Sequence, residues 1–311
     1  MPLRFTLRQL EYFVAVGEAG SIALASDRVN VSSPSISAAI AQLEREFGLP
    51  LFVRRHAHGL SLTQAGRQFM DQARRVLKEA GALGRLAGEL SGRVQGPLAL
   101  GCLLTFAQHV VPRLRRGFED RHTEVRIEQG EHDQAELIRR LRRAEIDVAL
   151  TYDLDIPSDL TFLPLAELPP LAVLGAAHPL ADRASVSVAE LAEHPMVQLD
   201  LPLSAEYFLS FFNGTGKSPR IVERTRDMAV MRSLVANGFG FSFANVRPLS
   251  DQAADGGALV YVPLKDNLRP MRMGLAMVEG ADSVLTVRAF VAHCRAEITD
   301  AAIPGLRMEA R

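Results

Sequence analysis

The chain has 311 residues, of which 48% are hydrophobic and 23% charged, a composition typical of a globular protein with two or three folded units. Its net charge of −1 excludes a polycation, so any affinity for nucleic acid must come from a local surface. Its two cysteines, Cys102 and Cys294, exclude a disulfide framework, and because no apolar run reaches about 18 residues, we expect a cytoplasmic protein without a membrane partner.

Three short helices are expected in the first 50 residues. Residues 7–18 place a row of apolar side chains on one helical face, namely Leu7, Leu10, Phe13 and Val14. Ser21 can cap a second helix, whose inward face carries Ile22, Ala25 and Val29. Asn30 and Val31 interrupt the pattern, and Ser32 or Ser33 then caps a third helix with Pro34 in its first turn.

The third helix has two contrasting faces. Apolar residues at spacings of four, three and four predict a core-facing stripe of Ile36, Ile40, Leu43 and Phe47. The opposite face carries small and polar residues, namely Ser35, Ala38, Ala41, Gln42 and Arg45. After a tight turn, this pattern predicts a helix-turn-helix, because small side chains let a helix sit deep in the major groove. From this segment alone, the surface face of an ordinary helical bundle fits equally well.

The segment LPLFVRRHAHGLSLT (49–63) has strand-like ends around a turn that contains glycine, which predicts a hairpin. Arg54 and Arg55 lie near its tip, so beside a helix-turn-helix the hairpin reads as a wing that contacts phosphate or the minor groove. His56 and His58 are an alternative metal pair, but two ligands without a nearby cysteine or carboxylate make a weak site. We therefore expect no metal and no cofactor.

A long helix is expected from Thr63 to about Ser91. Its apolar residues alternate between spacings of four and three, which is a heptad period: Phe69, Ala73, Val76, Ala80, Leu83, Ala87 and Leu90. We interpret Phe69, Val76, Leu83 and Leu90 as dimerisation residues, and packing of this face on its own domain is the alternative. The first 92 residues hold 11 Lys and Arg against 8 Asp and Glu, a modest excess of the sign that DNA requires.

After GRVQGP (92–97), which indicates a hinge, strands and helices alternate. Strands are expected at 97–101, 125–129 and 146–151, with helices at 105–119 and 133–143. This alternation predicts parallel βαβ units in an α/β domain.

A second α/β segment is expected to form a second lobe. It has strands at 171–175, 196–199, 239–244 and 259–264, helices at 204–212 and 227–237, and a capping box of Ser187 and Glu190. The strand 271–278 and the helix 283–298 are expected to rejoin the first lobe. Two such lobes form a cleft, where small ligands usually bind.

Several segments closely resemble the LysR-type transcriptional regulators, and together they span essentially the whole chain. The specific ones are LRQLEYFVAVGEAGS (7–21), VSSPSISAAIAQLEREFGLPLF (31–52) and LTQAGRQF (62–69). Weaker ones follow in the right order: EIDVAL (145–150), HPL (178–180) and LVANGFGFSF (234–243).

The resemblance implies an all-α-type winged helix-turn-helix domain (1–62), a linker helix that pairs subunits (63–92) and an α/β effector-binding domain (93–311). The last would resemble the two-lobed type 2 periplasmic binding proteins, with lobe I at about 97–164 and 266–300 and lobe II at about 165–265. Such regulators are usually dimers of dimers. They bind double-stranded promoter DNA and change its bending when a small effector enters the cleft.

The resemblance also implies functional residues. The DNA-binding set is Ser33, Pro34, Ser35, Ala38, Gln42, Arg54 and Arg55. The effector-binding set is Leu103, Leu104, Thr105, Gln134 and Ser204, and the position of Thr105 at a helix start favours an anionic effector. Ser33 and Ala38 depart from the Gln and Arg that family members often carry there. Specificity would therefore depend more on Ser35, on contacts of Ala38 with thymine methyl groups, on the wing and on DNA shape.

Other patterns leave alternatives open. RRLRR (139–143) resembles a nucleic-acid patch but fits the solvated face of an amphipathic helix better. Cys102 could sense redox state, although a lone buried cysteine is more often a small apolar residue. We expect no enzyme, because the nucleotide-binding, hydrolase and zinc motifs are absent from the sequence. A DNA-binding architectural protein without an effector is the remaining alternative.

Overall fold

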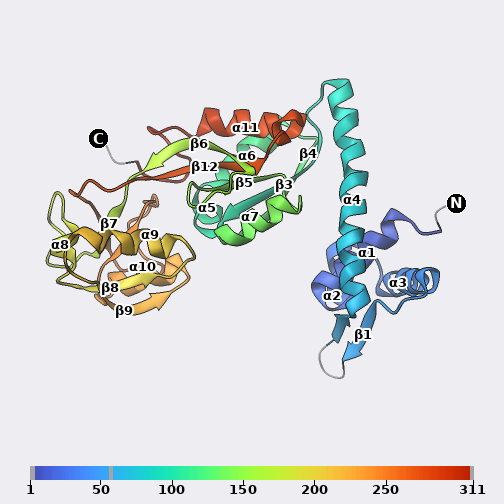
Figure 1. The fold of residues 1–311 in the computed structure, drawn as a ribbon, viewed down its shortest axis with the longest axis horizontal. Coiled ribbons are helices and arrows are strands. Elements are labelled where there is room, and N and C mark those ends of the chain that lie inside the picture. Colours follow the sequence, from blue (N-terminus) through green and yellow to red (C-terminus); the bar gives the residue numbers. More distant parts are fainter. Residues whose placement is uncertain (1–3, 56–58, 309–311) are drawn as a thin grey trace. The chain divides into compact units, whose positions relative to one another are not determined.

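The computed structural model describes residues 4–55 and 59–308 (Figure 1). The chain divides into two compact units, Met1–Leu90 and Ser91–Arg311, and each has hydrophobic cores of its own. Among the described residues, no helix is both long and apolar enough to cross a membrane.

The first unit is a three-helix winged fold. Its elements are α1 (Leu7–Ala19), α2 (Ile22–Val29), α3 (Ser33–Phe47), the antiparallel hairpin of β1 (Phe52–Arg55) and β2 (Gly59–Leu62), and α4 (Gln64–Ser91). The middle of each predicted stripe forms the core, since Phe13, Ile36 and Leu43 are fully buried, whereas Leu7 at the start of the α1 stripe is exposed. Phe47, at the end of the α3 stripe, stays partly exposed and packs against the rings of Phe5 and Phe69.

Side-chain caps explain where the first helices begin and end. Thr6 and Gln9 form a capping box at the start of α1, and the Ser21 hydroxyl accepts the Leu24 N–H at the start of α2. Asn30 ends α2 with a φ of +52°, a conformation that asparagine tolerates better than most residues. The chain can therefore turn sharply into α3, as the sequence predicted.

Gly66 allows α4 to lie directly against the wing. The Thr63 hydroxyl accepts the Gly66 N–H at 2.8 Å and donates to the Pro50 carbonyl at 2.8 Å. A Cβ atom on Gly66 would lie only 2.1 Å from the carbonyl oxygen of Leu51, which is main chain and has little freedom to move. The close approach of α4 to the loop before β1 therefore depends on glycine at this position.

We expect Gly66→Ala to destabilise the winged unit by about 1–3 kcal/mol, because an added methyl group must displace packed main chain. Urea unfolding of the full chain, followed by circular dichroism, measures this loss. Gly17→Ala in α1 is the matched control, since its added methyl would meet the flexible end of Met70. Equal stabilities of the two variants would contradict the close approach.

Lobe I of the second unit is a five-stranded sheet in the order β4-β3-β5-β12-β6. Its strands are β3 (Gly96–Leu103), β4 (Val125–His132), β5 (Val148–Tyr152), β6 (Leu160–Leu168) and β12 (Met271–Val278). As predicted, β3 pairs in parallel with β4 and β5. The return strand β12 also joins this sheet as predicted, antiparallel to β5 and β6.

Helices cover both faces of this sheet (Figure 1). On one face, α6 (Val111–Arg121) and α11 (Leu285–Glu297) bury Phe118 and Phe290 against alternate residues of β3, including Leu98 and Leu100. On the other face, α7 (Gln134–Arg142) buries Leu137 and Leu141. Alternate side chains of β3 therefore pack into the two hydrophobic cores on opposite faces of the sheet.

Lobe II is inserted between β6 and β12. In it, β7 (Leu171–Gly175) lies between β10 (Ser242–Ala244) and β11 (Leu259–Pro263), and β8 (Pro195–Leu199) pairs in parallel with β9 (Arg220–Thr225). Its helices are α8 (Val188–Leu191), α9 (Ser204–Ser210) and α10 (Met228–Ala236), and two short 3-10 turns are Phe211–Gly214 here and Ala281–Ser283 before α11. The predicted capping box of Ser187 and Glu190 opens α8.

The structure corrects several predicted elements. The strands β6 and β9 were not predicted. The single helix expected at 105–119 is two helices, α5 (Leu104–His109) and α6, because Pro112 lacks an N–H and starts the second one. The strand expected at 239–244 is only β10, since Gly240 has a φ of +153° and a Cβ there would lie 2.1 Å from the Pro195 carbonyl.

Candidate DNA interface and effector pocket

The predicted DNA-binding residues of α3 share its outer surface. Pro34, Ser35 and Ala38 are exposed, and Ser33 is half-buried in the first turn. The Ser35 and Ser32 hydroxyls lie 2.8 Å apart and bond each other. The outer surface at the start of α3 is therefore small and uncharged, which is the shape that close approach to a groove requires.

Gln42, one turn further along α3, is tied to α1. Its side-chain oxygen accepts a hydrogen bond from the Gln9 side-chain amide at 2.7 Å. Glu44 fixes the other end of the helix, because its carboxylate accepts the Leu51 and Phe52 N–H groups at 2.8 and 3.3 Å. These bonds hold the orientation of α3 relative to α1 and to the base of the wing.

Arg54 and Arg55 lie on β1, and their side chains are outside the part of the chain whose side chains the structure describes. His56 and His58, the alternative metal pair, fall outside the described residues. Within the described residues, no group of three His, Cys, Asp or Glu side chains could hold a metal ion.

The heptad face of α4 is packed on its own domain in the first turns and exposed further along. Phe69 packs on Phe13 and Phe47, with ring centroids 5.4 and 4.8 Å away, and Ala73 is buried, so these first turns belong to the core of the winged unit. Further along, Val76 is 41% exposed and Leu83 is 68% exposed. The side chain of Leu90 is not described. The exposed apolar part of the predicted seam therefore begins only at Val76.

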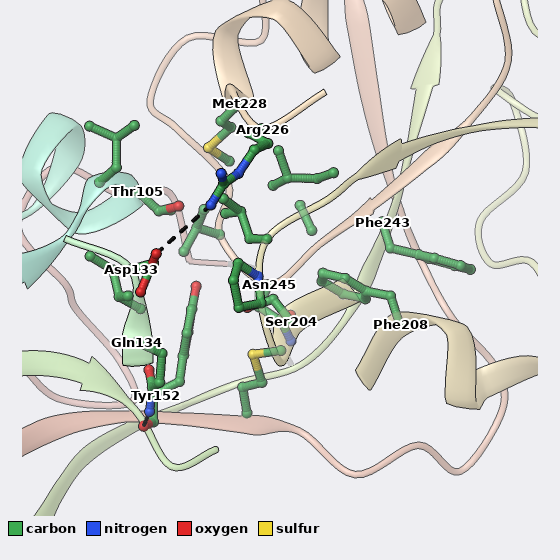
Figure 2. A pocket seen from close by; sticks show the side chains of 18 of the residues that line it. Thr105, Asp133, Gln134, Tyr152, Ser204, Phe208, Arg226, Met228, Phe243 and Asn245 are labelled. Carbon is green, nitrogen blue, oxygen red and sulfur yellow. Dashed lines mark hydrogen bonds and ion pairs between the residues drawn. The ribbon is translucent and has the colours of Figure 1, made fainter. Parts of the chain in front are cut away.

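A pocket of about 400 Å³ lies between the two lobes of the second unit. All five residues predicted to bind the effector line it: Leu103, Leu104, Thr105, Gln134 and Ser204. They come from the starts of α5, α7 and α9. Most of the remaining wall is apolar or aromatic, including Phe208, Met228, Phe243 and Met271 (Figure 2).

Gln134 lines the pocket without offering its amide to a ligand. Its side-chain nitrogen donates to the carbonyl oxygens of Tyr152 and Leu154 at 3.0 and 2.8 Å, and its oxygen accepts the Thr151 hydroxyl at 2.5 Å. Because both amide protons are used, this buried side chain fixes the end of β5 against the start of α7.

Thr105, Tyr152 and Arg226 bring donor groups into the pocket, and of these three the sequence pointed only to Thr105. The hydroxyls of Thr105 and Tyr152 point into the pocket, and the Arg226 guanidinium enters it from the other lobe (Figure 2). Thr105 is 9% exposed and Tyr152 is 6% exposed. Burial raises the pKa of Tyr152, so its phenol stays protonated and can donate.

An ion-pair cluster around the buried side chain of Asp153 joins the end of β5 to the chain segment that returns from lobe II. The Asp153 carboxylate bonds Arg269 and Arg272, each at 2.7 Å, and accepts the Arg272 N–H at 2.8 Å. Burial alone would raise the pKa of Asp153, but these hydrogen bonds outweigh it and hold the pKa below its usual value. The Tyr207 hydroxyl of α9 donates to the Arg269 carbonyl at 2.7 Å. The segment that returns from lobe II thus contacts Asp153, the residue that follows Tyr152.

The structure does not support redox sensing by Cys102 or nucleic-acid binding by the arginine run 139–143. Cys102 is fully buried, and burial raises the pKa of its thiol to about 12, which suppresses the reactive thiolate. On α7, Arg139 and Arg140 pair with Glu136, and Arg142 pairs with Asp159 through two hydrogen bonds of 2.7 and 2.6 Å. The arginine run is therefore largely neutralised by its own domain.

Comparisons with known proteins identify both units. Residues 7–67 match the model of the bacterial regulatory helix-turn-helix proteins of the lysR family, and residues 91–299 match the LysR substrate binding domain. The crystal structure of HinK, a LysR family transcriptional regulator from Pseudomonas aeruginosa, is 34% identical with a TM-score of 0.64, covering 95% of this chain and 99% of that one.

Two curated regulators are also similar. The HTH-type transcriptional regulator BudR of Raoultella terrigena is 31% identical over 76% of this chain and 83% of its own length. The DNA-binding transcriptional dual regulator OxyR of Escherichia coli K12 is 27% identical over 83% of this chain and 84% of its own length. These matches confirm the predicted winged and two-lobed architecture. The chain belongs to the LysR family of transcriptional regulators, so it is not an enzyme but a protein that binds DNA through its helix-turn-helix and responds to an effector in its C-terminal domain.

Proposed function

We propose that this regulator senses a small carboxylate in the pocket between its lobes. Three features support the proposal: a cation on one lobe, two available hydroxyls on the other, and an apolar wall around them. Arginine with hydroxyl donors suits a carboxylate, because charge-assisted hydrogen bonds are about twice as strong as neutral ones. The volume of about 400 Å³ lies within the range of about 300–1,000 Å³ found for small-molecule sites.

The DNA-binding surface in this proposal consists of Ser33, Pro34, Ser35, Ala38 and Gln42 on α3, with Arg54 and Arg55 on the wing. The exposed small face of α3 supports the first group. The linker helix would pair subunits through Val76, Leu83 and Leu90, with Phe69 at the margin of its own core, and two such dimers would form a tetramer. Exposed apolar residues on α4 support this pairing, because a helix seam of this kind is normally covered by a partner.

The effector would act by favouring one arrangement of the lobes, and hence one placement of the paired DNA-binding units and one degree of DNA bending. Such coupling requires that the effector bind one arrangement more tightly than the other. The regulator would act in the cytoplasm, where promoter DNA is accessible. Identical footprints and bend angles with and without saturating effector would contradict this mechanism.

A thermal-shift screen tests the effector class. Benzoate, phenylacetate and hexanoate are each compared with their neutral amides, which keep the shape and lose the charge. A binding carboxylate at about 100 times its Kd adds about 2.7 kcal/mol, or roughly 5–10 °C in a unit of this size. If the amides stabilise the protein as much as the acids, or if no carboxylate stabilises a protein that still binds DNA, the proposal is wrong.

A further inference from the structure

One ion pair crosses the mouth of the pocket and joins the two lobes. Asp133 precedes α7 in lobe I, and Arg226 precedes α10 in lobe II. The nearest charged atoms of their side chains lie 3.8 Å apart (Figure 2). The other carboxylate oxygen of Asp133 is already engaged, since it caps α7 by accepting the Glu136 N–H at 2.9 Å. Asp133 therefore has one oxygen for its helix and one for the opposite lobe.

This pair is built to be displaced rather than to lock the lobes. Its separation of 3.8 Å is close to the limit for an ion pair, and the side chains of Arg226 and Asp133 are 68% and 36% exposed. Exposed pairs of this kind change an equilibrium constant by about fivefold or less. Within the described residues, Asp133 is the sole ionic partner of Arg226.

A ligand carboxylate can offer Arg226 a better partner than Asp133 does. The Thr105 and Tyr152 hydroxyls point into the space beside the guanidinium, and neither has a hydrogen-bond partner among the described residues (Figure 2). A carboxylate seated there can accept from both hydroxyls and from Arg226, whereas Asp133 is held back by the helix that it caps. Among the described residues, Asp133 accepts a hydrogen bond from neither hydroxyl, so both donors remain for a ligand.

We propose that Asp133 is a built-in competitor for the effector carboxylate at Arg226. An entering carboxylate takes the guanidinium from Asp133, and the link between the lobes then runs through the ligand. Asp133 turns toward water and continues to cap α7 with its other oxygen. Its negative charge raises the effector concentration at which the regulator responds. This inference rests on the proposed carboxylate site.

The test compares Kd values for benzoate and phenylacetate, measured by isothermal titration calorimetry on the full chain. Asp133→Asn removes the charge and keeps a good helix cap, because asparagine caps as well as aspartate. We expect this variant to bind the carboxylates about two- to fivefold more tightly than wild type. Arg226→Gln should weaken them about tenfold or more, since it removes a charged hydrogen-bond partner. In the Arg226→Gln background, Asp133→Asn should have little further effect.

Asp227→Asn is the matched control. Asp227 caps α10 by accepting the Ala229 and Val230 N–H groups at 2.7 and 3.2 Å, and it lies next to Arg226 in sequence without lining the pocket. Equal tightening by Asp133→Asn and Asp227→Asn would show a general charge effect and overturn the competition. Unchanged affinity in Asp133→Asn, or tightening that persists without Arg226, would also overturn it while the carboxylate site stands. If neither carboxylate binds to the wild type or to Asp133→Asn, the proposed carboxylate site itself is refuted.

Discussion

Replacing Ser35 with glutamate should reduce operator affinity by about 100-fold or more, since like charges placed together at an interface cost several kcal/mol. Ser35 is exposed on the outer surface of α3, and its neighbours there carry no charge to offset the new carboxylate. If α3 enters the major groove through this surface, the carboxylate must approach the phosphates. Electrophoretic mobility shift with a duplex selected by the wild-type protein from random-sequence DNA measures the change.

The substitution should leave the fold intact. Glutamate in the first turn of a helix interacts favourably with the helix dipole, which offsets the lost bond between Ser35 and Ser32. Gln72→Glu on α4 is the charge-matched control, because Gln72 is exposed and lies outside the α3 surface. Operator binding by Ser35→Glu at wild-type strength would refute the orientation assigned to α3, and an equal loss in both variants would point to net charge alone.

Removing either hydroxyl from the pocket should weaken carboxylate binding by about 10- to 100-fold, because a hydrogen bond to a charged group contributes about 1.5–3 kcal/mol. Thr105→Val and Tyr152→Phe each delete one donor and nearly preserve side-chain volume. Both hydroxyls point into the pocket, and neither has a hydrogen-bond partner among the described residues, so neither change breaks a hydrogen bond there. Calorimetric titration with the carboxylates that stabilise the wild type measures the loss.

Tyr261→Phe provides the control for the tyrosine variant. Tyr261 is a buried lobe II residue whose hydroxyl lies outside the pocket. Its removal should therefore leave effector affinity unchanged. DNA binding without effector should also be unchanged in all three variants, since none of these residues lies in the winged unit. Full carboxylate affinity in both Thr105→Val and Tyr152→Phe would place the ligand elsewhere.

The winged unit was predictable because its signals are local. Capping side chains, the asparagine at the end of α2 and the apolar spacing of α3 each act within a few residues, and the helices begin and end within about one residue of their predicted bounds. Phe69 shows where local signals fail. A heptad period does not distinguish a seam for a partner from a face packed on its own domain, and at Phe69 and Ala73 the domain core takes that face.

The missed strands lack the usual strand pattern. The strand β6 contains Pro164 and pairs only with β12 at the edge of its sheet, where proline is tolerated. The strand β9, RIVERT, is also an edge strand, and most of its residues are exposed, so its sequence reads as a polar loop. Both are strands because tertiary pairing supplies the hydrogen bonds.

The pocket was only partly predictable for a related reason. The five predicted residues do line one cavity, but Gln134 uses its side chain to hold β5 rather than to face a ligand. Tyr152 ends a strand whose sequence is typical of an ordinary core strand, and Arg226 lies 74 residues later in the chain, just before α10. Only the folding of lobe II over lobe I brings these two side chains into the same space.

The order of strands in lobe I also has a consequence for how the protein is made. The strand β12 fills the gap between β5 and β6, yet it is synthesised only after the whole of lobe II. On the ribosome, the DNA-binding unit is complete long before the sensor can close its central sheet. A chain released before residue 271 would present the unpaired edge of β5 and a β6 without any partner, which makes it prone to aggregation and proteolysis. Late closure of the sheet thus favours removal of fragments that could occupy promoters without sensing anything.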